Sequence, residues 1–537
     1  MPPPRHIAIL GGGLTGLSSA FHLSRRFPNA RITLLEKQNR LGGWVRSEQI
    51  RLGSDGDPNS NPAALTVEAG PRTLRPASKS VLELINLLHL QSALLTTPRT
   101  APAARSRFLY APSLQRGLTA LPASALAFLG SPLRQVLLPA ILREPLRKSN
   151  RPRQPPKADL DEDESLASFL GRRFGPDVAR LLGSALCHGV YAADARELSV
   201  RAAFPALYGL EDRGGGSVVL GVLKDMVSFG KGKGKGEGVD EYDLGDVEAK
   251  MRGVAVYSFR GGMQTLSDAL VKALEAWPNV ELCAGEAASG IEMREDENDS
   301  LVVHTAARAL EPTHIVSALP LPVLQSILPP PTSHARPLPH LTANPASSVT
   351  VLSLVFAVPP HTIHPPGFGY LVPRPPEGYT PSPSPPAAEL GVLGTVFDSC
   401  ALPAQSQAEA EHTKLTVMLG GPFRVPLPSD DEELVTRVLA HLKEALQGDV
   451  PRPVAWRVWR HERCIPTLKV GHVRRMEELR AVLMEGAESG EGGTGNEKGE
   501  GWRRGAWRGR MEVVGAGVGG VSVGDCVEAG RRLGARW

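Results

Sequence analysis

The sequence predicts an α/β fold, α+β overall, in which both ends of the chain build one sheet and the middle is inserted between them. Three observations support this prediction. A glycine-rich turn at 11–16 lies between a strand pattern at 7–10 and a helical pattern at 17–27. A second glycine-rich turn, 515–520, follows a strand pattern at 511–514. Between these turns lie strong strand patterns at 349–358 and 413–419, in which β-branched residues alternate with others.

Length and composition limit the possibilities further. With 537 residues, 42% of them apolar, the chain is too long for one core, and two to four domains are expected. The 60 basic and 56 acidic residues leave a net charge of +4, which gives no reason to expect a nucleic-acid partner. The five cysteines are widely separated and form no C-x-x-C pair, so neither a disulfide framework nor a metal site is expected. No run of about 20 apolar residues is present, so no membrane-spanning helix is expected.

The first glycine-rich turn matches G-x-G-x-x-G, and its context makes the match informative. A strand precedes it, a helix follows it, and Glu36 ends the next strand. Glycines allow the backbone to approach a pyrophosphate, the helix N-terminus stabilises its charge, and the acid accepts hydrogen bonds from a ribose. An acid at position 36 favours the unphosphorylated ribose of NAD or FAD. The expected cofactor-binding residues are Gly11, Gly12, Gly13, Leu14, Thr15, Gly16 and Glu36.

The segment after Glu36 favours FAD over NAD. Arg40-Leu41-Gly42-Gly43-Trp44 resembles the extension of flavin amine-oxidase-like proteins, in which a second glycine pair lets the chain pass beneath the pyrophosphate. The turn at 515–520 leads into the last helix, whose N-terminus suits the flavin or its phosphates. One Rossmann-like FAD-binding domain assembled from both chain ends is therefore expected.

The middle of the chain alternates ordered patterns with low-complexity stretches. Helical patterns at 81–95, 121–147 and 165–188 carry leucine-rich faces beside arginines such as Arg134 and Arg143. Such helices suit docking on an anionic membrane, although core helices would show the same pattern. Further helices are expected at 263–277 and 430–447, and further strands at 279–283, 301–306 and 313–318. The stretches 213–250, 373–386 and 486–501 are expected to be inserts without a fold of their own.

Several longer motifs resemble those of the protoporphyrinogen oxidase family. They occur in the family's order and, apart from the low-complexity inserts, the resemblance covers nearly the whole chain. The motifs are Val67-Glu-Ala-Gly-Pro-Arg-Thr-Leu-Arg-Pro76, Cys187-His-Gly-Val-Tyr191 with Arg196-Glu-Leu-Ser199, Tyr257-Ser-Phe-Arg-Gly-Gly-Met263, and Cys464-Ile-Pro466 with Gly471-His472.

This resemblance implies a domain plan. The FAD-binding domain would comprise 1–80, 257–320 and 506–537, and a helical membrane-docking domain would comprise 81–204. A mixed-sheet substrate domain would comprise 205–256, containing the flexible insert 213–250, together with 321–505.

The resemblance also implies an activity and a location. Protoporphyrinogen IX would be oxidised to protoporphyrin IX, the penultimate step of haem biosynthesis, in three FAD-mediated hydride transfers that convert three oxygen molecules to hydrogen peroxide. The protein would be a homodimer, peripheral on the mitochondrial inner membrane and facing the intermembrane space. Hand-off of the product to ferrochelatase would follow.

Site residues carried over from the family complete the expectation. FAD contacts are expected from Trp44, Gly70, Pro71, Arg72, Thr73, Ala288, Ala516, Val521, Ser522 and Val523. Arg107 would pair with a substrate propionate, Phe368 and Leu371 would sandwich a pyrrole ring, and Met418 would line the pocket. The backbone of Gly189 would lie beside the reacting methylene bridge. His188 stands where relatives often have Arg, which puts the polarity of the pocket in question.

Two other readings remain open from the sequence. A flavin amine oxidase or a polyene desaturase could use the same fold, and an amine oxidase would need an aromatic cage. A flavoprotein scaffold without turnover is the second alternative, and the intact dinucleotide motif argues against it.

Overall fold

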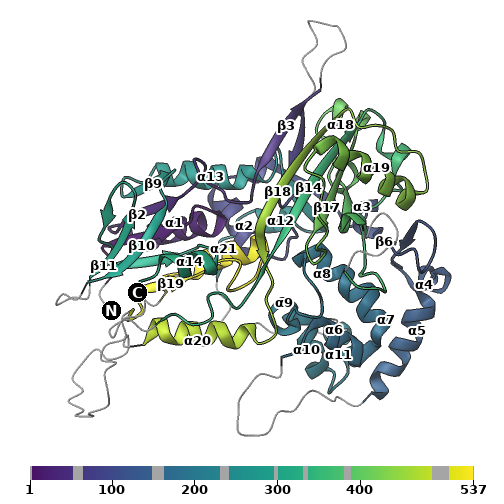
Figure 1. Ribbon diagram of the computed structural model, residues 1–537, viewed down its shortest axis with the longest axis horizontal. Coiled ribbons are helices and arrows are strands. Elements are labelled where there is room, and N and C mark those ends of the chain that lie inside the picture. The colour runs from purple at the N-terminus through teal and green to yellow at the C-terminus, as the bar shows by residue number, and fades with distance from the viewer. Residues whose placement is uncertain are drawn as a thin grey trace, which may run out of the picture.

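The computed structural model describes residues 3–52, 64–147, 163–229, 241–294, 300–329, 337–379, 389–485, 507–535 and 537. Of the expected inserts, 230–240, 380–386 and 486–501 lie outside these residues. Figure 1 shows a parallel-sheet region next to a long antiparallel sheet, with a group of helices below the latter.

A five-stranded parallel sheet forms the first region and joins distant parts of the chain. Its order is β19 (Met511–Val513), β13 (His314–Ser317), β1 (His6–Leu10), β2 (Arg31–Glu36) and β9 (Val280–Ala284). Strands from both ends of the chain therefore belong to one sheet, as expected. The two ends of the chain lie close together in Figure 1.

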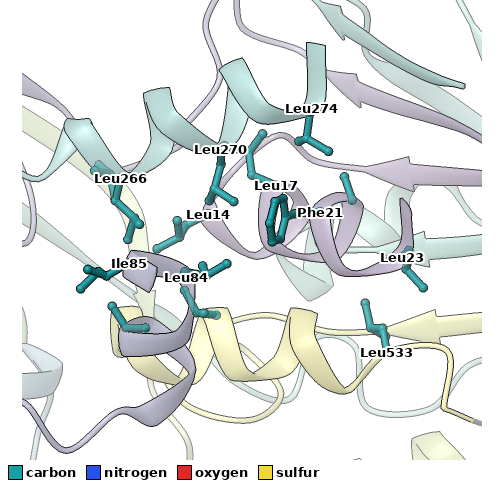
Figure 2. Close-up of a cluster of buried hydrophobic side chains, with 14 of the residues drawn as sticks. Leu14, Leu17, Phe21, Leu23, Leu84, Ile85, Leu266, Leu270, Leu274 and Leu533 are labelled. Carbon is teal, nitrogen blue, oxygen red and sulfur yellow. The ribbon is translucent and has the colours of Figure 1, made fainter. Parts of the chain in front are cut away.

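Four helices pack together beside this sheet through apolar side chains. They are α1 (Leu14–Arg26), α2 (Lys79–Leu87), α13 (Gln264–Glu275) and α21 (Val523–Arg532). Figure 2 shows Leu17 and Phe21 of α1 facing Leu270 and Leu274 of α13. Burial of each such side chain contributes about 1.5–3 kcal/mol, so this cluster holds the two chain ends to the middle segment.

Smaller strands and two helices complete the first region. The strands form a three-stranded sheet of β10 (Ala288–Met293), β11 (Leu301–Thr305) and β12 (Ala309–Leu310), and the pairs β3 (Ser47–Arg51) with β4 (Ala64–Glu68) and β5 (Leu94–Pro98) with β8 (Val254–Phe259). Residues of α14 (Leu321–Ile327) and α20 (His472–Met484) share a core cluster with β1, β10, β11, β13 and β19.

The second region is a mixed seven-stranded sheet. Its order is β18 (Ala455–Pro466), β14 (Ala346–Phe356), β17 (Thr413–Gly420), β16 (Val392–Phe397), β15 (Gly369–Leu371), β6 (Phe108–Tyr110) and β7 (Leu118–Ala120). All pairs are antiparallel except β15 with β6. Helix α19 (Asp431–Leu446) packs on this sheet, and the side chain of Asp430 caps it by accepting from the Glu433 amide. Short helices α3 (Pro102–Arg105), α15 (Pro360–Ile363), α17 (Asp398–Ala401) and α18 (Gln407–Glu411) lie in the connections.

The third region is helical. It contains α4 (Ala125–Gly130), α5 (Arg134–Arg143), η2 (Glu144–Leu146), α6 (Leu166–Phe174), α7 (Pro176–Val178), the π-helical turn η3 (Ala179–Gly183), α8 (Ser184–Tyr191), α9 (Val200–Ala203), α10 (Pro205–Arg213) and α11 (Val218–Phe229). Among the described residues, none of the helices combines the length and apolar composition needed to cross a bilayer.

A buried ion pair fixes α11 to this region. Glu144 and Arg173 are both fully buried, and the Arg173 Nε donates to Glu144 Oε1 over 2.7 Å. The same carboxylate accepts from the amides of Val218 and Val219 and from the Ser217 hydroxyl, so it also caps α11. Burial acts to raise the pKa of Glu144, but these hydrogen bonds outweigh it and keep the pKa below its ordinary value.

The structure differs from the expected segment boundaries in several places. Part of the stretch 213–250 is helical, since it contains α11 and α12 (Val247–Lys250). Helices α10 and α11 pack with the helical region, whereas Val247 and Met251 belong to the core of the parallel-sheet region. The helix expected at 81–95 ends at Leu87, and β5 begins at Leu94.

Candidate functional site

The glycine-rich turn and Glu36 form one hydrogen-bonded unit. The turn connects β1 to α1, and Glu36 is the last residue of β2. The Gly12 amide donates to Glu36 Oε2 over 2.8 Å, and the Gln38 amide donates to Oε1 over 2.9 Å. The carboxylate is therefore fixed at the carboxyl end of the sheet, beside the turn, as the sequence predicts.

The N-terminus of α1 is suited to bind an anion. Gly13 is its N-cap and provides no side-chain cap. The first amides of a helix have no intrahelical acceptor. Among the residues that the structure describes outside the turn, a Cβ on Gly13 would meet only the Gly43 Cα, at 3.9 Å. A Cβ on Gly16 would lie 1.9 Å from the Gly11 carbonyl oxygen. Gly16 is thus needed for packing of the turn, and Gly13 keeps the approach to the amides open.

The segment 40–44 lies against this turn. The Gly42 amide donates to the Gly12 carbonyl over 2.9 Å, and Gly43 has a φ of +60°. Arg40 donates to the carbonyls of Leu41, Gly43 and Val45 and so holds the segment in its bent shape. A side chain at Gly43 would crowd Gly13 at 3.0 Å, which explains the second glycine pair.

Trp44 and Gly70–Thr73 form the next part of the site. Trp44 is 47% exposed, and its ring makes an edge contact with His461 at 5.0 Å between centroids. A Cβ on Gly70 would lie 2.3 Å from the Trp44 carbonyl oxygen, so the two backbones approach closely. The pKa of His461 is lowered by burial, and its Nε2 lies 2.8 Å from the Ala69 carbonyl oxygen.

Arg72 links this segment to the seven-stranded sheet. It is buried, and its Nη1 lies 3.7 Å from Oδ1 of Asp398, the first residue of α17. Both residues line a cavity that also contains Glu68, Glu409 and Lys414. Burial raises the pKa of Glu68 to about 7, against the opposing effects of hydrogen bonds from the Met263 amide and the Ser47 hydroxyl. The predictions did not include this cavity, because its residues come from separate segments.

The second glycine-rich turn lies beside the first. A Cβ on Gly515 would be 3.8 Å from the Thr15 Oγ1, and Gly11 and Gly515 both approach the Ala318 carbonyl. Ala516 is half-buried in this turn. Ser522 is engaged in a capping box with Asp525, which occupies both its amide and its hydroxyl. Val521 and Val523 flank Ser522, and Val523 is the first residue of α21.

Ala288 begins β10, close to the residues that follow Glu36. Ala284 at the end of β9 pairs with Glu36, and the Gly285 amide donates to the Gln38 carbonyl over 2.8 Å. All the sequence-predicted cofactor residues therefore belong to the parallel-sheet region or to the segments that adjoin it. The open helix N-terminus, the acid and the glycine contacts fit a dinucleotide with a pyrophosphate and a ribose.

Three of the expected substrate residues lie close together around β16: Gly189, Leu371 and Met418. Leu371 pairs with Gly394 on one side, and Met418 pairs with Gly394 on the other. A Cβ on Gly394 would lie 2.9 Å from Leu371 Cδ2, and a Cβ on Gly189 would lie 2.7 Å from the same atom. Gly189 of α8 and Leu371 of β15 are therefore in contact, and Met418 is the next half-buried side chain along the sheet.

Arg107, which directly precedes β6, and Phe368, which directly precedes β15, form a second contact. The Arg107 guanidinium carbon lies 6.0 Å from the centroid of the Phe368 ring. Burial and the neighbouring charge of Arg75 lower the pKa of Arg107. A negatively charged ligand group would offset the repulsion between these two cations.

His188 lies next to Gly189, and the sequence left open how it affects the polarity of the pocket. It is 3% exposed and precedes Gly189 in α8. Its Nδ1 lies 2.7 Å from the Val372 carbonyl oxygen, and its Nε2 lies 2.9 Å from the Tyr379 hydroxyl. Burial lowers its pKa to about 4, so the ring is neutral at physiological pH. Tyr379 falls in the stretch 373–386, which was expected to be an insert without a fold of its own. The sequence therefore did not indicate the contact between His188 and Tyr379.

Comparisons with known proteins agree with the geometry. The family model described as flavin containing amine oxidoreductase matches residues 14–532. The protoporphyrinogen oxidases of Macaca fascicularis and Homo sapiens are each 32% identical to this chain, covering 98% of it and 97% of their own length. That of Schizosaccharomyces pombe is 29% identical, with 98% and 96% covered.

Solved structures support the fold. One from Exiguobacterium sp. 255-15, described provisionally as a protoporphyrinogen oxidase, has a TM-score of 0.69 at 21% identity and covers 98% of this chain and 97% of its own. A putrescine oxidase bound to putrescine has a TM-score of 0.55 at 15% identity, with the same shares covered. At these identities the likeness establishes the fold alone.

Proposed function

Since the chain belongs to the protoporphyrinogen oxidase family of flavin-containing amine oxidoreductases, we propose that it oxidises protoporphyrinogen IX to protoporphyrin IX with oxygen as acceptor. Three hydride transfers would remove six electrons and six hydrogens, and three oxygen molecules would become three hydrogen peroxide. The observation that carries the proposal is the identity of 32% to two such enzymes over nearly their full length.

We assign FAD as the flavin. Support comes from the open N-terminus of α1, which suits a pyrophosphate, and from Glu36, which suits a ribose. When bound, the flavin accepts the hydride and returns the electrons to oxygen, so the protein supplies orientation and exclusion of water. Trp44 and Gly70–Thr73 would border it on the side that faces the seven-stranded sheet.

The substrate is assigned to the surface formed by Gly189, Leu371, Met418, Phe368 and Arg107. A porphyrinogen is a large apolar disc with carboxylates at one edge, so it requires apolar walls and a cation. Leu371 and Met418 provide apolar area on adjacent strands, and the small Gly189 lets the disc approach the backbone of α8. Arg107, beside Arg75, would receive a propionate.

A direct assay tests the reaction. Purified protein in aerated detergent buffer receives freshly reduced protoporphyrinogen IX, and porphyrin fluorescence and peroxide are followed together. A rate well above the enzyme-free rate, with one peroxide for each pair of electrons, is expected. A yellow protein that shows no excess over the blank would contradict the proposal and direct attention to amines or polyenes.

We further propose peripheral membrane association through the helical region. Large apolar side chains are exposed on α4, α5, η2 and α11, among them Leu142 at 65%, Leu146 at 84% and Met226 at 68%. The basic residues Arg134 and Arg143 lie on α5, and such a combination favours an anionic bilayer surface. A mitochondrial inner-membrane location facing the intermembrane space, a homodimer and hand-off to ferrochelatase remain expectations from the family.

A further inference from the structure

His188 connects two walls of the assigned substrate surface, which touch each other at Gly189 and Leu371. One wall is helix α8, which carries Gly189, and the other is the end of β15, which carries Leu371. Val372 directly follows Leu371, and its carbonyl is the group that His188 contacts over 2.7 Å. The hydrogen bond therefore joins the residue before Gly189 to the residue after Leu371.

The contact with the Val372 carbonyl determines which tautomer of His188 is present. A carbonyl oxygen only accepts hydrogen bonds, so Nδ1 must carry the hydrogen that it donates to Val372. Nε2 is then an acceptor, and the Tyr379 hydroxyl donates to it over 2.9 Å. Both polar atoms of this buried ring are satisfied, as burial requires.

Aromatic and cationic contacts hold Tyr379 in position. The Phe423 ring lies 5.0 Å from Tyr379 and 5.6 Å from His188, measured between centroids. The Arg196 guanidinium carbon lies 5.6 Å from the Tyr379 ring, and Arg196 is itself paired with Asp194 over 2.6 Å. Tyr379 thus fixes His188 from the side remote from Val372.

We propose that His188 is a positioning residue that fixes helix α8 against the end of β15 and thereby holds Gly189 and Leu371 in the relative position in which both face the substrate disc. It acts through the Val372 carbonyl and does not itself contact the reacting atoms. Tyr379 supports it by keeping Nε2 an acceptor. This inference rests on the assignment of the substrate to the surface to which Gly189 and Leu371 contribute.

Variants at position 188 test the inference in the full-length flavin-loaded protein. His188→Ala removes both hydrogen bonds and should raise the KM for protoporphyrinogen IX about tenfold, with flavin content unchanged, because a lost buried hydrogen bond has this order of effect. His188→Asn places an amide N–H near the position of Nδ1 and should restore KM to within about threefold of the unsubstituted protein. If His188→Ala left KM unchanged, or Asn gave no recovery, the positioning role would be refuted.

A double substitution adds a signature that general destabilisation would not give. In His188→Asn, the Tyr379 hydroxyl loses its acceptor, so adding Tyr379→Phe should cost nothing further. In the unsubstituted background, Tyr379→Phe should raise KM about two- to threefold, since it unpairs Nε2. Additive effects of the two substitutions would contradict the coupling.

His441 provides a matched control. It is also fully buried and bonded to a tyrosine, with its Nε2 2.8 Å from the hydroxyl of Tyr370, in the core of the α19 side of the sheet. His441→Ala should lower the melting temperature to a similar extent as His188→Ala and leave KM unchanged. An equal rise of KM in both variants would show that loss of stability, and not positioning, is responsible.

Amide hydrogen exchange tests, without substrate turnover, whether His188 holds α8 and the end of β15 together. His188→Ala should speed exchange in both 184–191 and 369–379, and His188→Asn should reverse this effect in 184–191. Unchanged exchange would reject the role of His188 whatever the substrate is. Failure of the unsubstituted protein to oxidise protoporphyrinogen, with altered exchange in His188→Ala, would reject the proposed function alone.

Discussion

The glycines of the first turn differ in what surrounds them, although they match one motif. A Cβ at Gly12 would lie 2.5 Å from Leu41 and 2.8 Å from Glu36, while a Cβ at Gly13 would have only one atom within 4 Å. Gly12 and Gly16 therefore serve the packing of the turn, and Gly13 leaves the space before the α1 amides open.

Gly13→Val should consequently remove the flavin while the fold persists. The side chain would enter the space before the α1 amides, and the loss of a glycine N-cap costs only about 1 kcal/mol. The visible flavin absorbance of the purified protein measures the result. Gly12→Ala is the contrasting variant, which should lower the melting temperature through its collisions with Leu41 and Glu36. A yellow Gly13→Val protein would contradict this assignment.

Arg107 can be tested in the same manner. Arg107→Ala should raise the KM for protoporphyrinogen IX at least tenfold without loss of flavin, because a charge-assisted hydrogen bond contributes about 1.5–3 kcal/mol. Steady-state kinetics measure the KM of each variant. The exposed Arg105, at the end of α3, provides a control whose replacement by Ala should leave KM unchanged. Equal KM values for both variants would reject the propionate contact.

At the residue level, the sequence indicated which residues lie together where those residues are close to one another in the chain. The spacing from Gly16 to Glu36 placed the acid beside the turn because a strand, a helix and a second strand leave little freedom. His188 was identified only as a departure from relatives. Its partners, Val372 and Tyr379, are more than 180 residues away in sequence, so no local pattern indicated that it would be neutral and doubly bonded.

At the level of elements, α11 is the largest difference between expectation and structure. Its sequence, Val-Val-Leu-Gly-Val-Leu-Lys-Asp-Met-Val-Ser-Phe, is apolar and lies between glycine-rich stretches, which suggested a linker. The helix is begun by a carboxylate from Glu144, more than 70 residues earlier in the chain. Elements whose patterns are periodic and self-capped, such as α19, were predicted within one or two residues.

The Glu144–Arg173 pair should be essential for the stability of the helical region. Glu144→Gln removes the nearer of the two carboxylates that face the buried Arg173, the other being Glu211 at 3.8 Å, and it weakens the cap of α11. Breaking a buried pair completely costs about 3–5 kcal/mol, which is the upper limit for this variant. Chemical denaturation would measure the loss. Glu433→Gln, in an exposed pair with Arg437, is the control and should change stability by less than about 1 kcal/mol. Comparable losses in the two variants would show that burial is not the cause.

The exposed apolar side chains of α5 and α11 should control membrane binding. Leu142→Glu and Met226→Glu should each reduce binding to vesicles that contain anionic lipid by about tenfold, in line with about 1–2 kcal/mol for each apolar side chain withdrawn. Vesicle sedimentation measures this, and activity in detergent should be unchanged. Val454, 53% exposed beside the seven-stranded sheet, is the control position. Equal binding of all three glutamate variants would refute the docking face.

At the scale of the whole molecule, the cavity around Glu68 lies where the parallel-sheet region meets the seven-stranded sheet. A carboxyl with a raised pKa holds its proton more tightly in the folded state. Its stabilising effect is complete below the ordinary pKa of glutamate and is lost as pH rises through about 7.

Stability should therefore fall between about pH 5 and pH 8, by up to roughly 3 kcal/mol for a shift of this size. Glu68→Gln should reduce that dependence and make the protein more stable than the unsubstituted form at the upper end. The amide can still accept from Met263 and bond to Ser47. Denaturation curves at both pH values test this, and an unchanged pH slope in the variant would locate the titrating group elsewhere.

The strands of the parallel sheet come from widely separated parts of the chain, and this has a consequence for biosynthesis. Strand β1 is made early, but its neighbour β13 does not emerge until after residue 317, and β13 gains its own outer neighbour only with β19 at 511–513. During translation, β13 presents an unpaired edge, which is prone to wrong association. Helix α21, which packs on α1, emerges still later. The parallel-sheet region is therefore complete only after these last residues have been made, and messages cut short before them should yield a chain that quality control removes rather than a partly active enzyme.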